Sequence, residues 1–173
     1  MSQPTQLSLS ATLSTSSDGG YNINCYGGST GSITPSVSGG TPPYSYSWST
    51  ADGSGLVAGA SVQNALTAGT YLLTVTDANG CIISGSYTLT QPPAIVVTPS
   101  ADDYTIGTCP ASKSNLSVNV TGGVPLPGGI YSYNWTPPAG LNYSNVANPV
   151  AKPAVTTIYT VTVTDRNGCT APA

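Results

Sequence analysis

Short runs of alternating apolar and polar residues recur along the chain, and this period of two indicates β-strands that bury one face. The alternation is clearest in six segments: residues 33–38, 44–48, 71–76, 116–121, 131–135 and 159–164. Gly-Gly, Pro-Pro and Asn-Gly pairs, which favour turns, interrupt these runs. No segment has the period of an amphipathic helix. The pattern predicts an all-β protein built from antiparallel sandwiches.

The second half of the chain repeats the first. The motif SGGTPPYSYSW (38–48) matches TGGVPLPGGIYSYNW (121–135), and GTYLLTVTDANGC (69–81) matches TIYTVTVTDRNGC (157–169). Four positions recur at offsets of 84 to 88 residues: Cys25, Trp48, Tyr71 and Cys81 return as Cys109, Trp135, Tyr159 and Cys169. Such repetition predicts a repeated structural unit. We therefore divide the chain into two modules, residues 1–92 and 93–173, joined near Gln91-Pro92-Pro93.

The composition excludes most catalytic chemistry. The chain of 173 residues has no His, no Glu and only 5% charged residues, and its three basic residues are Lys113, Lys152 and Arg166. Groups for general acid–base catalysis and for zinc or iron ligation are therefore scarce. Three cations also cannot form the basic surface that nucleic acids require. We expect no enzyme and no nucleic-acid partner.

The chain also lacks the signals of membrane insertion. No stretch approaches the roughly 18 consecutive apolar residues of a membrane-spanning helix, and Met1-Ser2-Gln3-Pro4 does not begin a signal peptide. We expect a chain that does not insert into a membrane, whose export signal, if it has one, lies outside this sequence.

The repeated motifs resemble a known family. CYGGSTGSITPSVSGGTPPYSYSW (25–48), followed by LTAGTYLLTVTDANGC (66–81) and SYTLTQP (86–92), resembles the SprB repeat, a module of large surface adhesins in gliding bacteria. The second module, with YSYNWTPPAGL and NPVAKPAVTTIYTVTVTDRNGC, is similar to the immunoglobulin-like or PKD-like units found in the same kind of protein. The resemblance covers most of residues 21–92 and, less tightly, 93–169.

This resemblance implies two tandem immunoglobulin-like sandwiches in a protein exported by the type IX route. It also implies display on the bacterial cell surface and a part in adhesion and gliding motility, with neighbouring repeats of the same adhesin as partners. We expect a stalk repeat within an adhesive filament. The alternative is a module that itself binds glycans or surfaces, through faces such as Tyr44-Ser45-Tyr46-Ser47-Trp48.

Four cysteines allow three pairings. Repeat symmetry selects Cys25 with Cys81 and Cys109 with Cys169, because each module then has one cysteine before its first strong strand and one after its Thr-Asp-x-Asn-Gly turn. One disulfide per module is the expectation, and it indicates an oxidising, extracytoplasmic setting. Neither a C-x-x-C pair nor a His suggests a metal or redox role for these cysteines.

The Asp-x-Asn-Gly turns raise the possibility of calcium binding. Asp77, Asn79, Asp165 and Asn167 carry oxygen atoms of the kind that calcium prefers, whereas six to eight such ligands are needed and carboxylates are few. A simpler interpretation is a tight hairpin, in which the Asp side chain accepts hydrogen bonds from nearby amides and Gly adopts a positive φ. Calcium stays a weak hypothesis, and no other cofactor is expected.

The ends of the two modules differ. After Cys81 the first module continues through a full strand, IISGSYTL, whereas only Thr170-Ala171-Pro172-Ala173 follow Cys169. The second module is therefore predicted to lack its last strand. Either the chain is a segment cut from a longer repetitive protein, or residues 5–14 of a neighbouring molecule fill the open edge and build a fibre.

Overall fold

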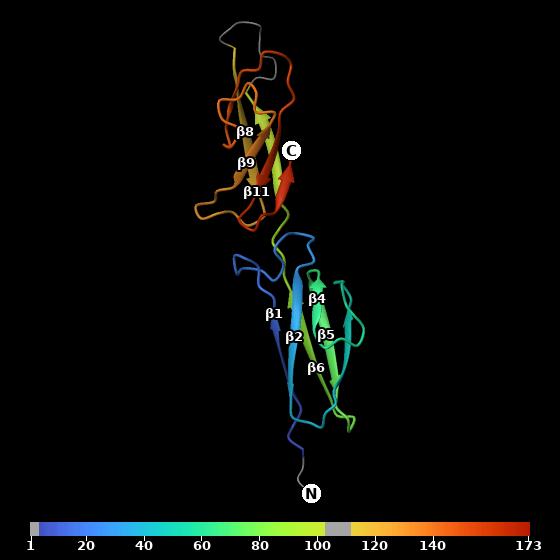
Figure 1. The fold of residues 1–173 in the computed structure, drawn as a ribbon. Helices are drawn as coiled ribbons and strands as arrows, with labels where there is room; N and C mark the ends of the chain where they lie inside the picture. Colours follow the sequence, from blue (N-terminus) through green and yellow to red (C-terminus); the bar gives the residue numbers. More distant parts are fainter. Residues whose placement is uncertain (1–3, 103–111) are drawn as a thin grey trace. The chain divides into compact units, whose positions relative to one another are not determined.

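The structure is a computed structural model that describes residues 4–102 and 112–173. It divides into two compact units, Met1–Pro92 and Pro93–Ala173 (Figure 1). This boundary lies at the Pro-Pro joint where the sequence repeat starts again.

The first unit contains six strands in two antiparallel sheets of three. The strands are β1 (Ser8–Leu13), β2 (Gly31–Ser38), β3 (Ser45–Thr50), β4 (Gln63–Leu66), β5 (Gly69–Thr76) and β6 (Ile82–Leu89). One sheet has the order β1-β2-β4 and the other the order β3-β5-β6. The chain therefore crosses between sheets after β2, after β3 and after β4 (Figure 1).

The second unit repeats this topology. Its strands are β7 (Val96–Ala101), β8 (Ser114–Thr121), β9 (Ser132–Thr136), β10 (Val150–Ala151), β11 (Thr160–Thr164) and β12 (Thr170–Pro172). The sheet orders are β7-β8-β10 and β9-β11-β12, and each strand occupies the place of its counterpart six strands earlier. The described residues form no helix, so the prediction of an all-β, antiparallel fold is confirmed.

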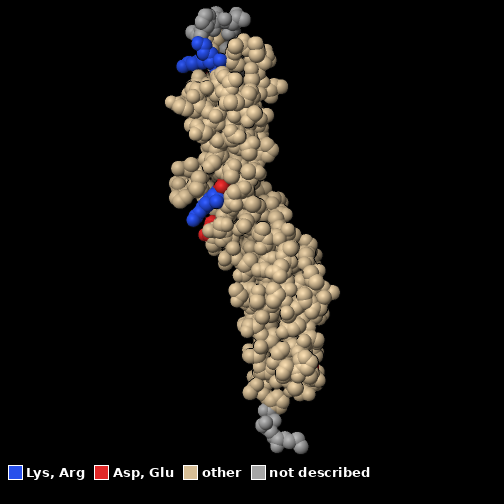
Figure 2. All heavy atoms as spheres, in the orientation of Figure 1, with Lys and Arg blue, Asp and Glu red and all other residues tan. Residues whose placement is uncertain are grey.

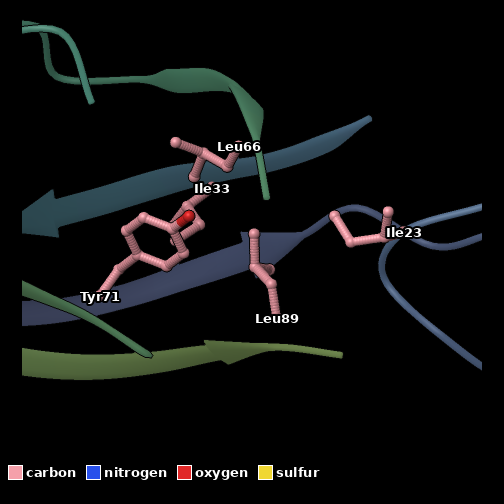
Figure 3. Close-up of a cluster of buried hydrophobic side chains, with 5 residues drawn as sticks. All are labelled: Ile23, Ile33, Leu66, Tyr71 and Leu89. Atoms are coloured by element: carbon pink, nitrogen blue, oxygen red, sulfur yellow. The ribbon is translucent and has the colours of Figure 1, made fainter. Parts of the chain in front are cut away.

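Both sheets of the first unit contribute to its core. Ile33 on β2 and Leu66 on β4 meet Tyr71 on β5 and Leu89 on β6, and Ile23 joins them from the segment before β2 (Figure 3). All five side chains are buried. Burying a Leu or Ile side chain stabilises a fold by about 1.5–3 kcal/mol, so this cluster stabilises the packing of the two sheets against each other.

The core of the second unit is built in the same way. Trp135 on β9 and Val161 and Val163 on β11 are buried, and Val97 and Leu116 from the opposite sheet pack against them.

The alternation along the predicted strands is confirmed. Tyr71, Leu73 and Val75 of β5 are buried, whereas Leu72, between them, is 51% exposed. β11 follows the same pattern, with Val161 and Val163 buried and Thr160 exposed. A strand with a period of two packs one face against the other sheet and leaves the second face to water.

The aromatic strand turns its rings inward. Tyr44, Tyr46 and Trp48 are half-buried while the intervening serines are exposed. Trp48 packs against the core and lies 6.3 Å from Tyr87, between ring centroids. Its indole N–H donates to the Ala60 carbonyl at 3.0 Å. The Trp135 indole donates in the same way to Val146, at 2.9 Å.

One expectation about strand edges is wrong, and the structure weighs against one of the alternatives. The second unit does have a final strand, because β12 pairs with β11 over Thr170–Pro172, although it is three residues long where β6 has eight. The segment considered as a donor strand is already used, because β1 pairs with β2 along its whole length in the first unit. Its hydrogen-bonding edge toward β2 is therefore not open to another molecule.

The pairing of Cys25 with Cys81 is also wrong. Among the described residues, Cys25 and Cys169 each take part in a disulfide. Cys81, by contrast, is a free and exposed thiol. Cys109, the expected partner of Cys169, lies outside the described residues. The prediction of one disulfide within the first module therefore fails.

The physical reason is the length of the β5–β6 ladder. Cys81 belongs to the hairpin next to the Thr76–Ile82 pair, whereas Cys25 follows Ile23, whose amide bonds to Thr90 beyond the opposite end of the ladder. The ladder runs from Gly69 to Thr76, and at about 3.4 Å per residue it is roughly 24 Å long. A disulfide requires Cα atoms within about 7 Å of each other.

Candidate functional site

Each unit places one buried carboxylate in the hairpin between its last two strands. Asp77 follows β5 and Asp165 follows β11, and both belong to the Asp-x-Asn-Gly turns identified in the sequence. Both side chains are buried, although hairpins usually lie at the protein surface. Backbone amides surround each of them.

The carboxylate of Asp77 joins two segments that are far apart in the sequence. Its Oδ1 accepts hydrogen bonds from the amides of Asn79, at 2.9 Å, and Cys81, at 2.8 Å, within its own hairpin. Its Oδ2 accepts from the amide of Thr41, at 2.9 Å, in the turn between β2 and β3. Because β2 and β5 lie in different sheets, this side chain ties the sheets together at one end of the unit.

The same contacts recur in the second unit. Asp165 Oδ1 accepts from the amides of Asn167 and Cys169, both at 2.9 Å, and Oδ2 accepts from Val124, also at 2.9 Å. We call this arrangement the carboxylate clamp: Asp77 with Thr41, Asn79 and Cys81 in the first unit, and Asp165 with Val124, Asn167 and Cys169 in the second.

A Gly-Gly turn makes room for each clamp. Gly39 and Gly40 have φ values of 72° and 62°, in the left-handed region that favours glycine. A Cβ on Gly39 would lie 2.0 Å from the Gln6 carbonyl oxygen, and one on Gly40 would lie 2.8 Å from Asp77 Oδ2. The turn and the carboxylate are therefore in direct contact.

The second unit again shows the same fit. Gly122 and Gly123 also have positive φ, a Cβ on Gly122 would lie 1.9 Å from the Ala94 carbonyl oxygen, and one on Gly123 would lie 2.9 Å from Asp165 Oδ2. In the sequence, the glycine pairs by themselves indicate only turns. Both modules contain a Gly-Gly pair and an Asp-x-Asn-Gly motif. This shared recurrence is the signal that could have predicted a contact between the turn and the hairpin.

Hydrogen bonds to the charged form of Asp77 hold its pKa below its usual range. The Thr41 amide makes the largest contribution and the Cys81 amide the next, partly opposed by burial, and the Asn79 amide and the Cys81 side chain add to the lowering of the pKa. A carboxylate that accepts several backbone hydrogen bonds is stabilised in its ionised form. The clamp is therefore an interaction of a negative charge with peptide dipoles.

This geometry bears on the calcium hypothesis. The simpler interpretation of Asp77, Asn79, Asp165 and Asn167 as hairpin residues agrees with the contacts, because both oxygens of each carboxylate face amide N–H donors. The described part of the chain holds no cluster of three or more His, Cys, Asp or Glu residues that could bind a metal. A cation would have to displace those donors, so the arrangement weighs against a site, and calcium binding stays a prediction.

The visible surface is nearly uncharged. Figure 2 shows few Lys, Arg, Asp or Glu side chains on the face in view, most of which is formed by uncharged residues. The most exposed large apolar side chains belong to Ile158, at 84%, and Val155, at 74%, with Ile82, Tyr143 and Tyr26 above 60%. No helix within residues 4–102 and 112–173 has the length and apolar character needed to cross a membrane.

The Gly-Gly turn allows a test with a matched control. Gly59 has φ 73°, almost the same as Gly39, and a Cβ there would meet nothing within 4 Å. We expect Gly59→Ala to cost about 1–2 kcal/mol of the free energy of unfolding from backbone strain. Gly39→Ala should cost about 2–5 kcal/mol, because the clash with Gln6 is added. Equal losses in urea denaturation would contradict the close approach.

The clamp also predicts a pH dependence. Because the pKa of Asp77 is lower in the folded chain than in the unfolded chain, its stabilising effect is complete above about pH 4 and is lost as the pH falls through the folded pKa. Asp77→Asn should lower the melting temperature near about pH 6 and reduce the further loss between about pH 6 and pH 3.

Asp52→Asn is the control for this measurement. Asp52 is exposed and accepts one backbone hydrogen bond, from Thr70 at 2.8 Å, whereas Asp77 accepts three. The measurement is thermal denaturation of both variants across this pH range. If Asp52→Asn reduced the fall in melting temperature at low pH as much as Asp77→Asn does, this result would contradict the clamp.

Calcium can be tested directly on the same protein. A ligand that binds only the folded state raises the melting temperature. If the carboxylates serve the clamp and bind no calcium, thermal denaturation should give the same melting temperature with millimolar calcium as with chelator. A rise with calcium that disappears in the Asp77→Asn variant would instead support a metal role for this turn.

Comparison with known families supports the resemblance that the motifs suggest. The model of the family described as SprB repeat matches residues 21–53, a segment that contains β2, β3 and the Gly39–Gly40 turn. No curated protein matches the chain. SprB repeats are typical of surface proteins, so the match indicates an adhesin-type repeat of the cell surface. Residues 21–53, within the first unit, are therefore similar to the SprB repeat.

Proposed function

We propose that this chain is a stalk repeat of a secreted cell-surface adhesin, exported by the type IX route and acting in surface attachment and gliding motility. In this role the two units are immunoglobulin-like spacers that carry load between an adhesive region and the cell. The SprB repeat at residues 21–53 is the observation that carries the proposal. Neighbouring repeats of the same adhesin are the expected partners.

The inward orientation of the aromatic strand supports a spacer over a binder. A sugar-binding platform needs aromatic faces that a ligand can reach, whereas Trp48 packs against the core and against Tyr87. Burial raises the pKa of the Tyr87 hydroxyl, as it does for Tyr131 and Tyr159 in the second unit. The outward positions on β3 are serines, which offer little apolar contact area.

The way the sheets are joined also suits a load-bearing module. In each unit the core links the two sheets through apolar contacts, and the carboxylate clamp links them again through directional hydrogen bonds at one end. Hydrogen bonds to an ionised group are stronger than neutral ones. A non-enzymatic role is part of the proposal, since the charged residues of the chain are too few for common acid–base chemistry.

The alternative is direct contact with a glycan or another surface. It is favoured by the exposure of Tyr26 and Tyr143, each with more than 60% of its side chain accessible. Exposed tyrosines of this kind contribute apolar area and a hydroxyl to carbohydrate and protein contacts. Each unit thus offers one exposed tyrosine as a contact surface. Tyr26 and Tyr143 are therefore the residues to substitute in a binding test.

Binding of the purified chain to a panel of surface polysaccharides and to glass separates the two functions. The spacer role predicts no saturable binding, with calcium or with chelator. Saturable binding to one polysaccharide that falls in the Tyr26→Ala or Tyr143→Ala variant would contradict the spacer role and support the alternative. Ser47→Ala, an exposed change on β3, is the matched control and should leave any binding unchanged.

A further inference from the structure

The chain enters the first unit at the end where the carboxylate clamp lies. Ser8, the first residue of β1, pairs with Ser38, the last residue of β2, and the Gly39–Gly40 turn follows directly. β6 begins opposite Thr76, next to the clamp hairpin, and ends opposite Gly69 at the other end of the ladder. The chain therefore enters at one end of the unit and leaves at the other, so tension between these points acts along the strands.

The segment before β1 is hydrogen-bonded to the Gly-Gly turn. The Gly40 amide donates to the Thr5 carbonyl at 2.8 Å, and Gly39 lies so close to the Gln6 carbonyl that a Cβ would clash there. Tyr44, directly before β3, donates its hydroxyl to the Gly39 carbonyl at 2.6 Å. The turn is therefore fixed to the entering chain and to the start of β3.

The next residue of the turn connects it to the clamp hairpin. The Thr41 amide donates to Asp77 Oδ2 at 2.9 Å, and the Thr41 carbonyl accepts from the Ala78 amide at 2.8 Å. The side-chain amide of Asn79 donates to the Thr41 hydroxyl, also at 2.8 Å. A continuous path of hydrogen bonds thus leads from the entering chain through the turn to the hairpin after β5, the central strand of the other sheet.

The second unit contains the same path. β7 begins opposite the last residue of β8, the Gly123 amide donates to the Pro93 carbonyl at 2.9 Å, and the Tyr131 hydroxyl donates to the Gly122 carbonyl at 2.7 Å. Pro93 follows Pro92 at the joint between the units. Tension transmitted along the chain from the first unit therefore enters the second unit at a residue that is bonded to its Gly-Gly turn.

We propose that this path is the mechanical anchor of each unit, which transfers tension from the entering chain through the Gly-Gly turn and the clamp aspartate to the central strand of the opposite sheet. The inference deepens the proposed stalk role and rests on it. Ladder hydrogen bonds lie perpendicular to the strands, so many must break together before β1 can slide along β2. The anchor adds hydrogen bonds to an ionised group, which are stronger than neutral ones.

The test pulls the intact chain by its two ends in single-molecule force spectroscopy, with a reductant present so that no disulfide limits the extension. The two unfolding steps differ in length, because Met1–Pro92 is longer than Pro93–Ala173. Asp77→Asn should make the first unit unfold about tenfold or more faster at the same force, the factor expected for the loss of one hydrogen bond to a charged group. The second step should not change, and Asp165→Asn should show the reverse pattern.

A core variant separates the anchor from general stability. Leu73 is buried at the centre of β5, away from the turn and the hairpin, and Leu73→Ala lowers the free energy of unfolding through lost apolar contacts. Urea denaturation with reductant measures this loss for each variant. Relative to that loss, Asp77→Asn should accelerate unfolding under force more than Leu73→Ala does. An equal or smaller acceleration would overturn the proposal.

A milder pair of variants keeps the test valid if Asp77→Asn folds poorly. Tyr44→Phe removes only the hydroxyl that supports the turn and should accelerate unfolding under force about threefold, as the loss of a neutral hydrogen bond does. Tyr46 is also half-buried, and its hydroxyl makes no hydrogen bond to the described residues, so Tyr46→Phe is the matched control. Equal rates for the two variants would overturn the anchor. Failure of the stalk role would appear separately, as saturable binding in the polysaccharide experiment.

Discussion

The carboxylate clamp is the interaction on which the arrangement of each unit depends. A single aspartate accepts three backbone hydrogen bonds, two from its own hairpin and one from the turn that connects the two sheets. The turn can come this close because it consists of two glycines with positive φ. The ionised carboxylate accepts hydrogen bonds from amide donors at the point where the backbone leaves its sheet. Without an acceptor, buried amides at that point would cost free energy.

The clamp connects the fold to the proposed role. It occupies the carboxylates that could have formed a cation site, and it orders the hairpin that carries a cysteine. In the second unit that cysteine is bonded, and in the first it is a free thiol at the surface. The hairpin that closes each unit is therefore also the one that holds a cysteine next to the clamp.

Much of the fold could be predicted because its signals are local. The period of two in β5 and β11, the inward rings of β3 and the hairpin role of Asp77 all follow from residues a few positions apart. Other elements lack such a signal. β4 is short, and its first residue, Gln63, is a polar side chain that is fully buried because it bonds to the backbone of Val57 and Ala60. Alternation cannot identify a strand of this kind.

The pairing of the cysteines is not determined by the sequence alone. Repeat symmetry established by itself that the chain holds two equivalent β units and that each has two cysteine positions and one clamp aspartate. Symmetry is the same whether a cysteine bonds within its unit or outside it, so it could not choose between these possibilities. The tertiary structure decided, because the strand ladder between Cys25 and Cys81 is several times longer than a disulfide can span.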